Sequence, residues 1–100
     1  MTLRISIRPG AARDLATARD WYESERSGLG SEFLDEIEAS LTRIAARPLD
    51  YAVVLDGTRR ALVRRFPYAI YFRVRGDDAR ILAVLHQARD PRVWRRRARG

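Results

Sequence analysis

The sequence predicts a single α+β domain of residues 1–100, in which an antiparallel sheet carries a helical hairpin on one face and ends in a short helix. Three observations predict this fold. Apolar residues first alternate with polar ones, then recur at helical spacing over two consecutive segments, and then alternate again over several short runs. A chain of 100 residues has room for one modest core. The element order is therefore β-α-α-β-β-β, with a C-terminal helical segment.

The N-terminal segment predicts a short strand. Leu3, Ile5 and Ile7 alternate with polar residues until Pro9-Gly10 ends the pattern. Alternation of this kind is typical of a strand with one buried face. We expect this strand to lie at or near an edge of the sheet.

Two helices follow the first strand. Ala11, Leu15, Ala18 and Tyr22 fall on one helix face and predict a helix over 11–26, which Gly28 closes. A second helix is expected over 29–47, ended by Pro48. Its predicted buried residues are Phe33, Leu34, Ile37, Leu41, Ile44 and Ala45. A link of a few residues favours an antiparallel hairpin of the two helices.

The second half of the chain returns to strands. Residues 51–55 and the Asp56-Gly57 pair are expected to form an extended lead-in and a turn, before strands over 60–66, 68–75 and 80–86. The connections are short, so these three strands must pair antiparallel. A terminal segment over 92–97 is expected to form one or two helical turns. The helical hairpin would cover one face of the sheet, and only this segment would lie on the other.

Composition excludes several classes of site. The chain has no cysteine and one histidine, so we expect no disulfide, no thiol nucleophile and no metal centre. It also lacks nucleotide-binding and hydrolase motifs, and no cofactor is expected. No apolar run is long enough for a membrane span or a secretion signal, so no membrane partner and a cytoplasmic location are expected.

Charge is concentrated in the second half of the chain. All 20 basic residues are arginine, against 13 acids, and the net charge is +7. Residues 51–100 contain 13 arginines and 4 acids, a balance of +9, whereas residues 1–50 have a balance of −2. A GC-rich genome alone could explain the absence of lysine, but the basic half predicts an acidic partner.

One set of residues could form a catalytic cluster. His86 ends the last strand, where it could act as a general acid or base. Tyr71 and Arg73 share a strand face, and either Arg64 or Arg65 could join them to hold a phosphodiester. The alternative is that these side chains are solvated, with His86 bonded locally or packed against Trp94.

The C-terminal segment combines one aromatic ring with several cations. Trp94 lies among Arg92, Arg95, Arg96 and Arg97, a composition typical of nucleic-acid-binding segments. The alternative is that Trp94 anchors the segment on the core. We expect Trp94 to be buried, Arg95 to Arg97 to divide between partner carboxylates and solvent, and deletion of residues 95–100 to spare the fold. Trp21 and Tyr22 are expected to pack in the core and hairpin.

Several short motifs, in their order and spacing, resemble the RelE/ParE superfamily of toxins from type II toxin–antitoxin systems, and more closely its ParE, or plasmid stabilization protein, branch. The resemblance covers almost the whole chain. It is carried by Ala12, Asp14-Leu15, Trp21-Tyr22, Gly28-Leu29-Gly30, Phe33-Leu34, Ile44, Pro48, Arg64-Arg65-Phe66-Pro67-Tyr68, Ile70-Tyr71-Phe72, Val84-Leu85-His86, Arg89-Asp90-Pro91 and Trp94.

This resemblance implies a growth-inhibiting toxin that forms a hetero-oligomer with an acidic antitoxin encoded adjacently. RelE-like members cleave messenger RNA on the ribosome, whereas ParE-like members act on DNA gyrase. The chain has no lysine and no tyrosine after Tyr71, unlike the RelE pattern, which favours a gyrase-directed inhibitor without a catalytic site. Target or partner binding is then assigned to Tyr71, Arg73, Arg92, Trp94, Arg95, Arg96 and Arg97.

Two alternatives stay open. Some nuclease members use a histidine near the C-terminal end of the sheet, so His86 could act with Arg64, Arg65, Tyr71 and Arg73 as a ribonuclease site. The chain could also be an antitoxin-binding module that has lost toxicity.

Overall fold

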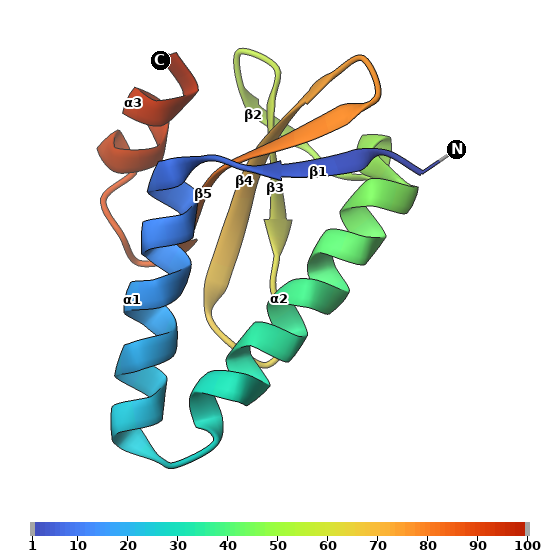
Figure 1. The fold of residues 1–100 in the computed structure, drawn as a ribbon. Helices are drawn as coiled ribbons and strands as arrows, with labels where there is room; N and C mark the ends of the chain where they lie inside the picture. Colours follow the sequence, from blue (N-terminus) through green and yellow to red (C-terminus); the bar gives the residue numbers. More distant parts are fainter. Residues whose placement is uncertain (1, 100) are drawn as a thin grey trace.

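A five-stranded sheet organises the molecule, with two long helices on one face and a short helix on the other (Figure 1). The computed structural model describes residues 2–99. The elements are β1 (Arg4–Ile7), α1 (Pro9–Glu25), α2 (Leu29–Ala46), a 3-10 turn (Pro48–Asp50), β2 (Val53–Leu55), β3 (Thr58–Leu62), β4 (Tyr68–Arg75), β5 (Asp78–His86) and α3 (Arg92–Arg99). The predicted α+β fold, with its helical hairpin and C-terminal helix, is confirmed.

The sheet has the strand order β1-β5-β4-β3-β2. The strands β2 to β5 pair antiparallel, as their short connections require, and β1 lies at an edge as expected. The expectation of a fully antiparallel sheet is wrong for β1, which runs parallel to β5. The chain runs through the helical hairpin and the strands β2 to β4 before it reaches β5, and a connection of that length permits parallel pairing.

The sheet also contains one strand more than predicted. Val53–Leu55, expected as an extended lead-in, pairs with β3 across the turn at Asp56-Gly57. The strand predicted over 60–66 instead covers Thr58–Leu62. It ends early because Arg65 adopts a positive φ of 70° and Pro67 has no N–H to donate to a ladder.

Glu23 and the two hairpin glycines fix the turn between α1 and α2. The Glu23 carboxylate accepts hydrogen bonds from the backbone N–H groups of Gly28, at 2.9 Å, and Gly30, at 3.0 Å. It thereby satisfies donors that a helix N-terminus leaves unpaired. A Cβ at Gly30 would lie 2.8 Å from the carbonyl oxygen of Arg19, so the close approach of the helices requires glycine there.

Side chains on opposite faces of the sheet enter two separate cores. The larger core lies under the helical hairpin and includes Tyr22, Phe33, Ile44, Ile70 and Phe72. The smaller core lies under α3 and consists of Ala69, Tyr71, Ala83, Leu85 and Trp94. Successive β4 residues alternate between these cores, as the period of a strand requires. The face without the hairpin is therefore covered over part of its area by α3.

Candidate binding surfaces around the C-terminal helix

Trp94 attaches α3 to the sheet. Its ring stacks on Tyr71 with centroids 4.8 Å apart and an interplanar angle of 12°, and only 7% of the residue is exposed. The expectation that Trp94 is buried is confirmed. Tyr71 faces away from the helical hairpin, as the strand pattern predicts, but it is itself only 5% exposed. Neither ring offers a free surface to a partner while α3 is in place.

Arg73 holds the C-terminal end of α3. One terminal nitrogen of its guanidinium lies 2.7 Å from the carbonyl oxygen of Ala98 and 2.9 Å from that of Asp56. The same nitrogen lies 3.3 Å from the hydroxyl of Thr58. A cation at the C-terminus of a helix interacts favourably with the helix dipole. Arg73 therefore joins β4, the β2–β3 turn and α3.

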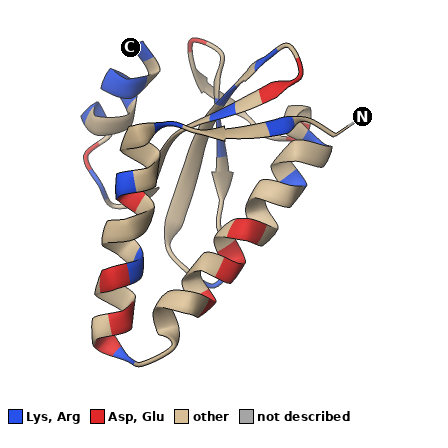
Figure 2. Cartoon of the chain, in the orientation of Figure 1, with Lys and Arg blue, Asp and Glu red and all other residues tan. Residues whose placement is uncertain are grey.

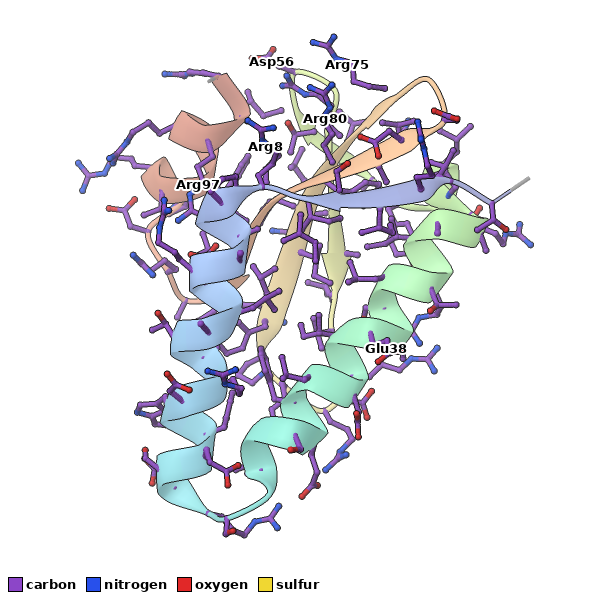
Figure 3. All side chains as sticks on the ribbon, viewed as in Figure 1. Arg8, Glu38, Asp56, Arg75, Arg80 and Arg97 are labelled. Carbon is purple, nitrogen blue, oxygen red and sulfur yellow. The ribbon has the colours of Figure 1, made fainter. Side chains whose placement is uncertain are left out.

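Arg97 forms a second attachment, to α1. Its guanidinium makes a two-point ion pair with Asp14, with one contact of 3.0 Å between Nη2 and Oδ1. Figure 3 shows Arg97 reaching toward the start of α1, near Arg8. Arg97 was expected to face solvent or carboxylates of a partner. This expectation is wrong, because its guanidinium is paired with Asp14 of the same chain.

The same ion pair completes an edge of the sheet. The strand β1 pairs with β5 only as far as Ile81. Beyond that point, Asp14 accepts the backbone N–H of Val84 at 2.9 Å, and Arg97 donates to the carbonyl of Leu82 at 3.3 Å. Asp14 and Arg97 therefore supply the hydrogen bonds that a longer neighbouring strand would have made. No local pattern in the sequence indicates this role of Asp14, whose partners lie 70 and 83 positions away.

The outward side of α3 consists of arginines. Arg92, Arg95, Arg96 and Arg99 surround a shallow hollow of about 340 Å³. Their spacing of three, four and seven residues places them on one side of a helix. We call these four residues the α3 arginine face. Figure 2 shows that basic residues gather on α3, whereas acidic residues lie mainly along the two long helices.

Asp90 organises the start of α3. Its carboxylate accepts the backbone N–H of Arg92 at 2.9 Å and pairs with the Arg92 guanidinium at 2.6 Å. These hydrogen bonds lower the pKa of Asp90 below its usual value and raise that of Arg92. Arg95 lies over the Trp94 ring, with its guanidinium carbon 5.5 Å from the ring centroid. Because Asp90 pairs with Arg92, the cation at the N-terminal end of the α3 arginine face is partly neutralised.

His86 lies exposed at the end of β5. Its Nδ1 accepts the backbone N–H of Ala88 at 3.0 Å, and its ring packs edge-on against Tyr68 at 5.5 Å. The local hydrogen bond matches one of the two structural alternatives given for His86. The ring packs on Tyr68 and not on Trp94.

The five residues of the possible ribonuclease site do not converge. The β4–β5 register places Tyr68 opposite His86 but Arg73 opposite Arg80, so Arg73 lies about 16 Å along the sheet from His86. Arg65 pairs with Glu32 at 2.8 Å and Glu36 at 3.5 Å, on the helical side.

The other two candidates, Arg64 and Tyr71, differ in exposure. Arg64 is exposed in the turn before β4, and Tyr71 is buried beneath Trp94. A phosphodiester held at Arg73 would therefore lie too far from His86 for direct proton transfer.

Two features of residues 2–99 bear on other classes of protein. No group of three or more His, Cys, Asp or Glu side chains in this range is placed to hold a metal ion. Within the same range, no helix has both the length and the apolar composition needed to cross a membrane.

The fold and its surfaces define a class of small α+β proteins in which a mixed sheet separates a helical hairpin from a basic C-terminal helix. A family model described as ParE toxin of type II toxin–antitoxin system, parDE, matches residues 5–91. The chain belongs to this family.

Two solved structures share the fold. The chromosomal ParDE toxin–antitoxin system from P. aeruginosa matches with a TM-score of 0.75 and 20% identity, over 85% of this chain and 96% of that one. The toxin–antitoxin complex RelBE2 from Mycobacterium tuberculosis matches with a TM-score of 0.60 and 20% identity, over 86% of this chain and 99% of that one. Among curated proteins, no sequence matches the chain.

Proposed function

We propose that this ParE-type toxin inhibits growth by binding a protein target, for which DNA gyrase is our favoured candidate, and that an acidic antitoxin encoded next to it neutralises it. The α3 arginine face is the observation that carries this proposal. Three of its four arginines have no carboxylate partner among residues 2–99. Exposed cations on a rigid helix are suited to bind an acidic protein surface.

The attachment of α3 supports a binding role. Trp94, Arg73 and Arg97 fix the helix to the sheet and to α1, so the backbone positions from which its outward arginines project are fixed. A surface that is ordered before binding loses less entropy on association. The α3 arginine face therefore suits recognition of a folded target.

A ribosome-dependent messenger-RNA endoribonuclease is the second candidate. One observation favours it. His86 lines the same hollow as Arg13 and Arg89. An exposed histidine beside two arginines could donate a proton to a leaving oxygen while the cations hold the phosphate.

Parallel assays of the purified chain distinguish the candidates. We expect the wild type and His86→Ala to inhibit gyrase-catalysed DNA supercoiling equally, and neither to cleave messenger RNA on ribosomes. A general acid contributes about 10²- to 10⁴-fold to a rate. Cleavage of messenger RNA that His86→Ala abolishes, in a variant that keeps its fold, would contradict the proposal. A chain that binds antitoxin without inhibiting growth would be an antitoxin-binding module.

A further inference from the structure

A groove runs along α1 at the end of the sheet opposite the β2–β3 turn. It consists of two adjoining hollows of about 220 and 500 Å³ that share Thr17, Ala18, Tyr68 and His86. Its walls come from α1 and from the ends of β4 and β5. We call it the α1 groove, lined by Arg13, Thr17 and Trp21 on the helix side and by Tyr68, His86 and Arg89 on the sheet side.

One end of the α1 groove is apolar. Trp21 is 56% exposed there, although the sequence predicted that it would pack in the core and hairpin. Tyr22, its neighbour, is buried as expected and contacts the Trp21 ring edge-on at 5.0 Å. The exposed Trp21 ring forms this end together with Pro67 and Tyr68. A large exposed aromatic beside a hollow is typical of a protein-binding surface.

The other end of the α1 groove is basic. Arg13 and Arg89 are exposed and line the smaller hollow. In the described part of the chain, neither forms an ion pair, and Asp14, which also lines this hollow, is neutralised by its pairing with Arg97. The apolar end has no arginine among its lining residues, which there are Trp21, Tyr22 and Pro67. A ligand with an acidic and an apolar end would therefore bind in one direction only.

We infer that the α1 groove binds a short acidic segment of the antitoxin, with an apolar side chain on Trp21 and a carboxylate at Arg13 and Arg89. This inference rests on the proposed function, which assigns an antitoxin to the chain. Tryptophan, tyrosine and arginine are the residues that contribute most to protein interfaces, and the groove contains all three.

The length of the α1 groove specifies the spacing of the two anchors. Arg13 and Trp21 are eight residues apart on α1, which corresponds to about 12 Å along the helix axis. An extended peptide covers that distance with about four residues. The segment is therefore expected to carry its acidic and apolar anchors about four positions apart.

The α1 groove and the α3 arginine face have no lining residue in common. Binding of antitoxin and binding of target are then separable by substitution. A nucleic acid suits the groove less well, because the end formed by Trp21 and Pro67 has no arginine to hold a phosphate.

Calorimetric titration of the purified chain with the co-encoded antitoxin tests this inference. We expect Trp21→Ala to weaken binding about 10- to 100-fold. Arg13→Glu with Arg89→Glu should weaken it at least as much and should reduce its dependence on salt. The matched control is Arg4→Glu with Arg47→Glu, which makes the same charge change at side chains that are 78% and 77% exposed outside the groove. All variants change exposed residues, and circular dichroism verifies their folds.

The outcomes separate this inference from the proposed function. If the antitoxin binds every groove variant as tightly as the wild type, the groove assignment is wrong while the antitoxin partner stands. If the antitoxin does not bind the wild-type chain, the proposed partner and the groove assignment both fail. Tight binding of a short RNA that Arg13→Glu with Arg89→Glu abolishes, with antitoxin binding unchanged, would reassign the groove to nucleic acid.

Discussion

Asp14 connects parts of the chain that lie far apart in the sequence. Its carboxylate pairs with Arg97 of α3 and accepts the N–H of Val84 in β5, and only 10% of the side chain is exposed. In the sequence it is one acid among several on the first helix. Its role depends on where β1 ends relative to β5. This register cannot be predicted from local patterns in the sequence.

We expect Asp14→Ala to lower the free energy of unfolding by about 2–4 kcal/mol, because it leaves Arg97 and the Val84 N–H without their acceptor in a mostly buried site. Urea denaturation measures this loss. Asp20→Ala is the control, since Asp20 is 69% exposed and its one ion pair within residues 2–99 is with Arg19. Equal stability of the two variants would show that Asp14 does not hold α3.

Glu32 links the hairpin to the β3–β4 turn. Hydrogen bonds from Arg65 and then Arg26 lower its pKa below the ordinary value of 4.5. The unfolded chain therefore takes up a proton at this site at higher pH than the folded chain does. The contribution of Glu32 to stability is present above pH 4.5 and is lost as the pH falls through the lowered pKa.

Glu32→Gln tests this linkage. We expect the variant to be less stable than the wild type at pH 7, and the difference to shrink as the pH falls below 4.5. Thermal unfolding at a series of pH values measures it. A difference that stays constant down to pH 2 would contradict the assignment.

The helical hairpin depends on close contact at Gly30. We expect Gly30→Ala to cost about 1–3 kcal/mol, because the added Cβ would lie 2.8 Å from a backbone oxygen of α1. Ser31→Ala, at the exposed neighbouring position, serves as the control. Thermal denaturation of both variants measures the effect, and a Gly30→Ala protein as stable as its control would argue against the tight helix contact.

Most elements could be predicted from periodicity, and the differences have local causes. The range of β4, 68–75, was predicted to the residue because alternation and turns mark both of its ends. The short strand β2 was missed because three residues are too few to establish a period. The direction of β1 could not be predicted, since its pairing with β5 joins segments more than 70 positions apart.

The helix α3 is a structural element as well as a basic segment. The sequence predicts that removal of residues 95–100 abolishes inhibition of the target with little loss of fold. The structure argues against the expected small effect on the fold, because Arg97 pairs with Asp14 and Ala98 is only 2% exposed. Substitution of the outward arginines is therefore the better way to test function. The sequence located Trp94 and the arginines but could not say which of the arginines face outward.

Charge is unevenly distributed over the molecule. Acids lie mainly along the two long helices and also at the β2–β3 and β4–β5 turns, whereas arginines gather on α3 (Figure 2). This distribution gives the molecule a direction of approach for an acidic partner. Association with such a partner is expected to weaken as salt increases, since the α3 arginine face lies at the surface.

Inhibition of gyrase supercoiling by Arg95→Glu with Arg96→Glu tests whether the α3 arginine face binds the target. Both side chains are exposed, so the free energy of unfolding of the double variant should lie within about 1–2 kcal/mol of the wild-type value. We expect it to lose inhibition at least tenfold, while Arg4→Glu with Arg47→Glu, which makes the same charge change elsewhere, inhibits like the wild type. Full inhibition by the folded Arg95→Glu, Arg96→Glu chain would contradict the assignment of the α3 arginine face to the target.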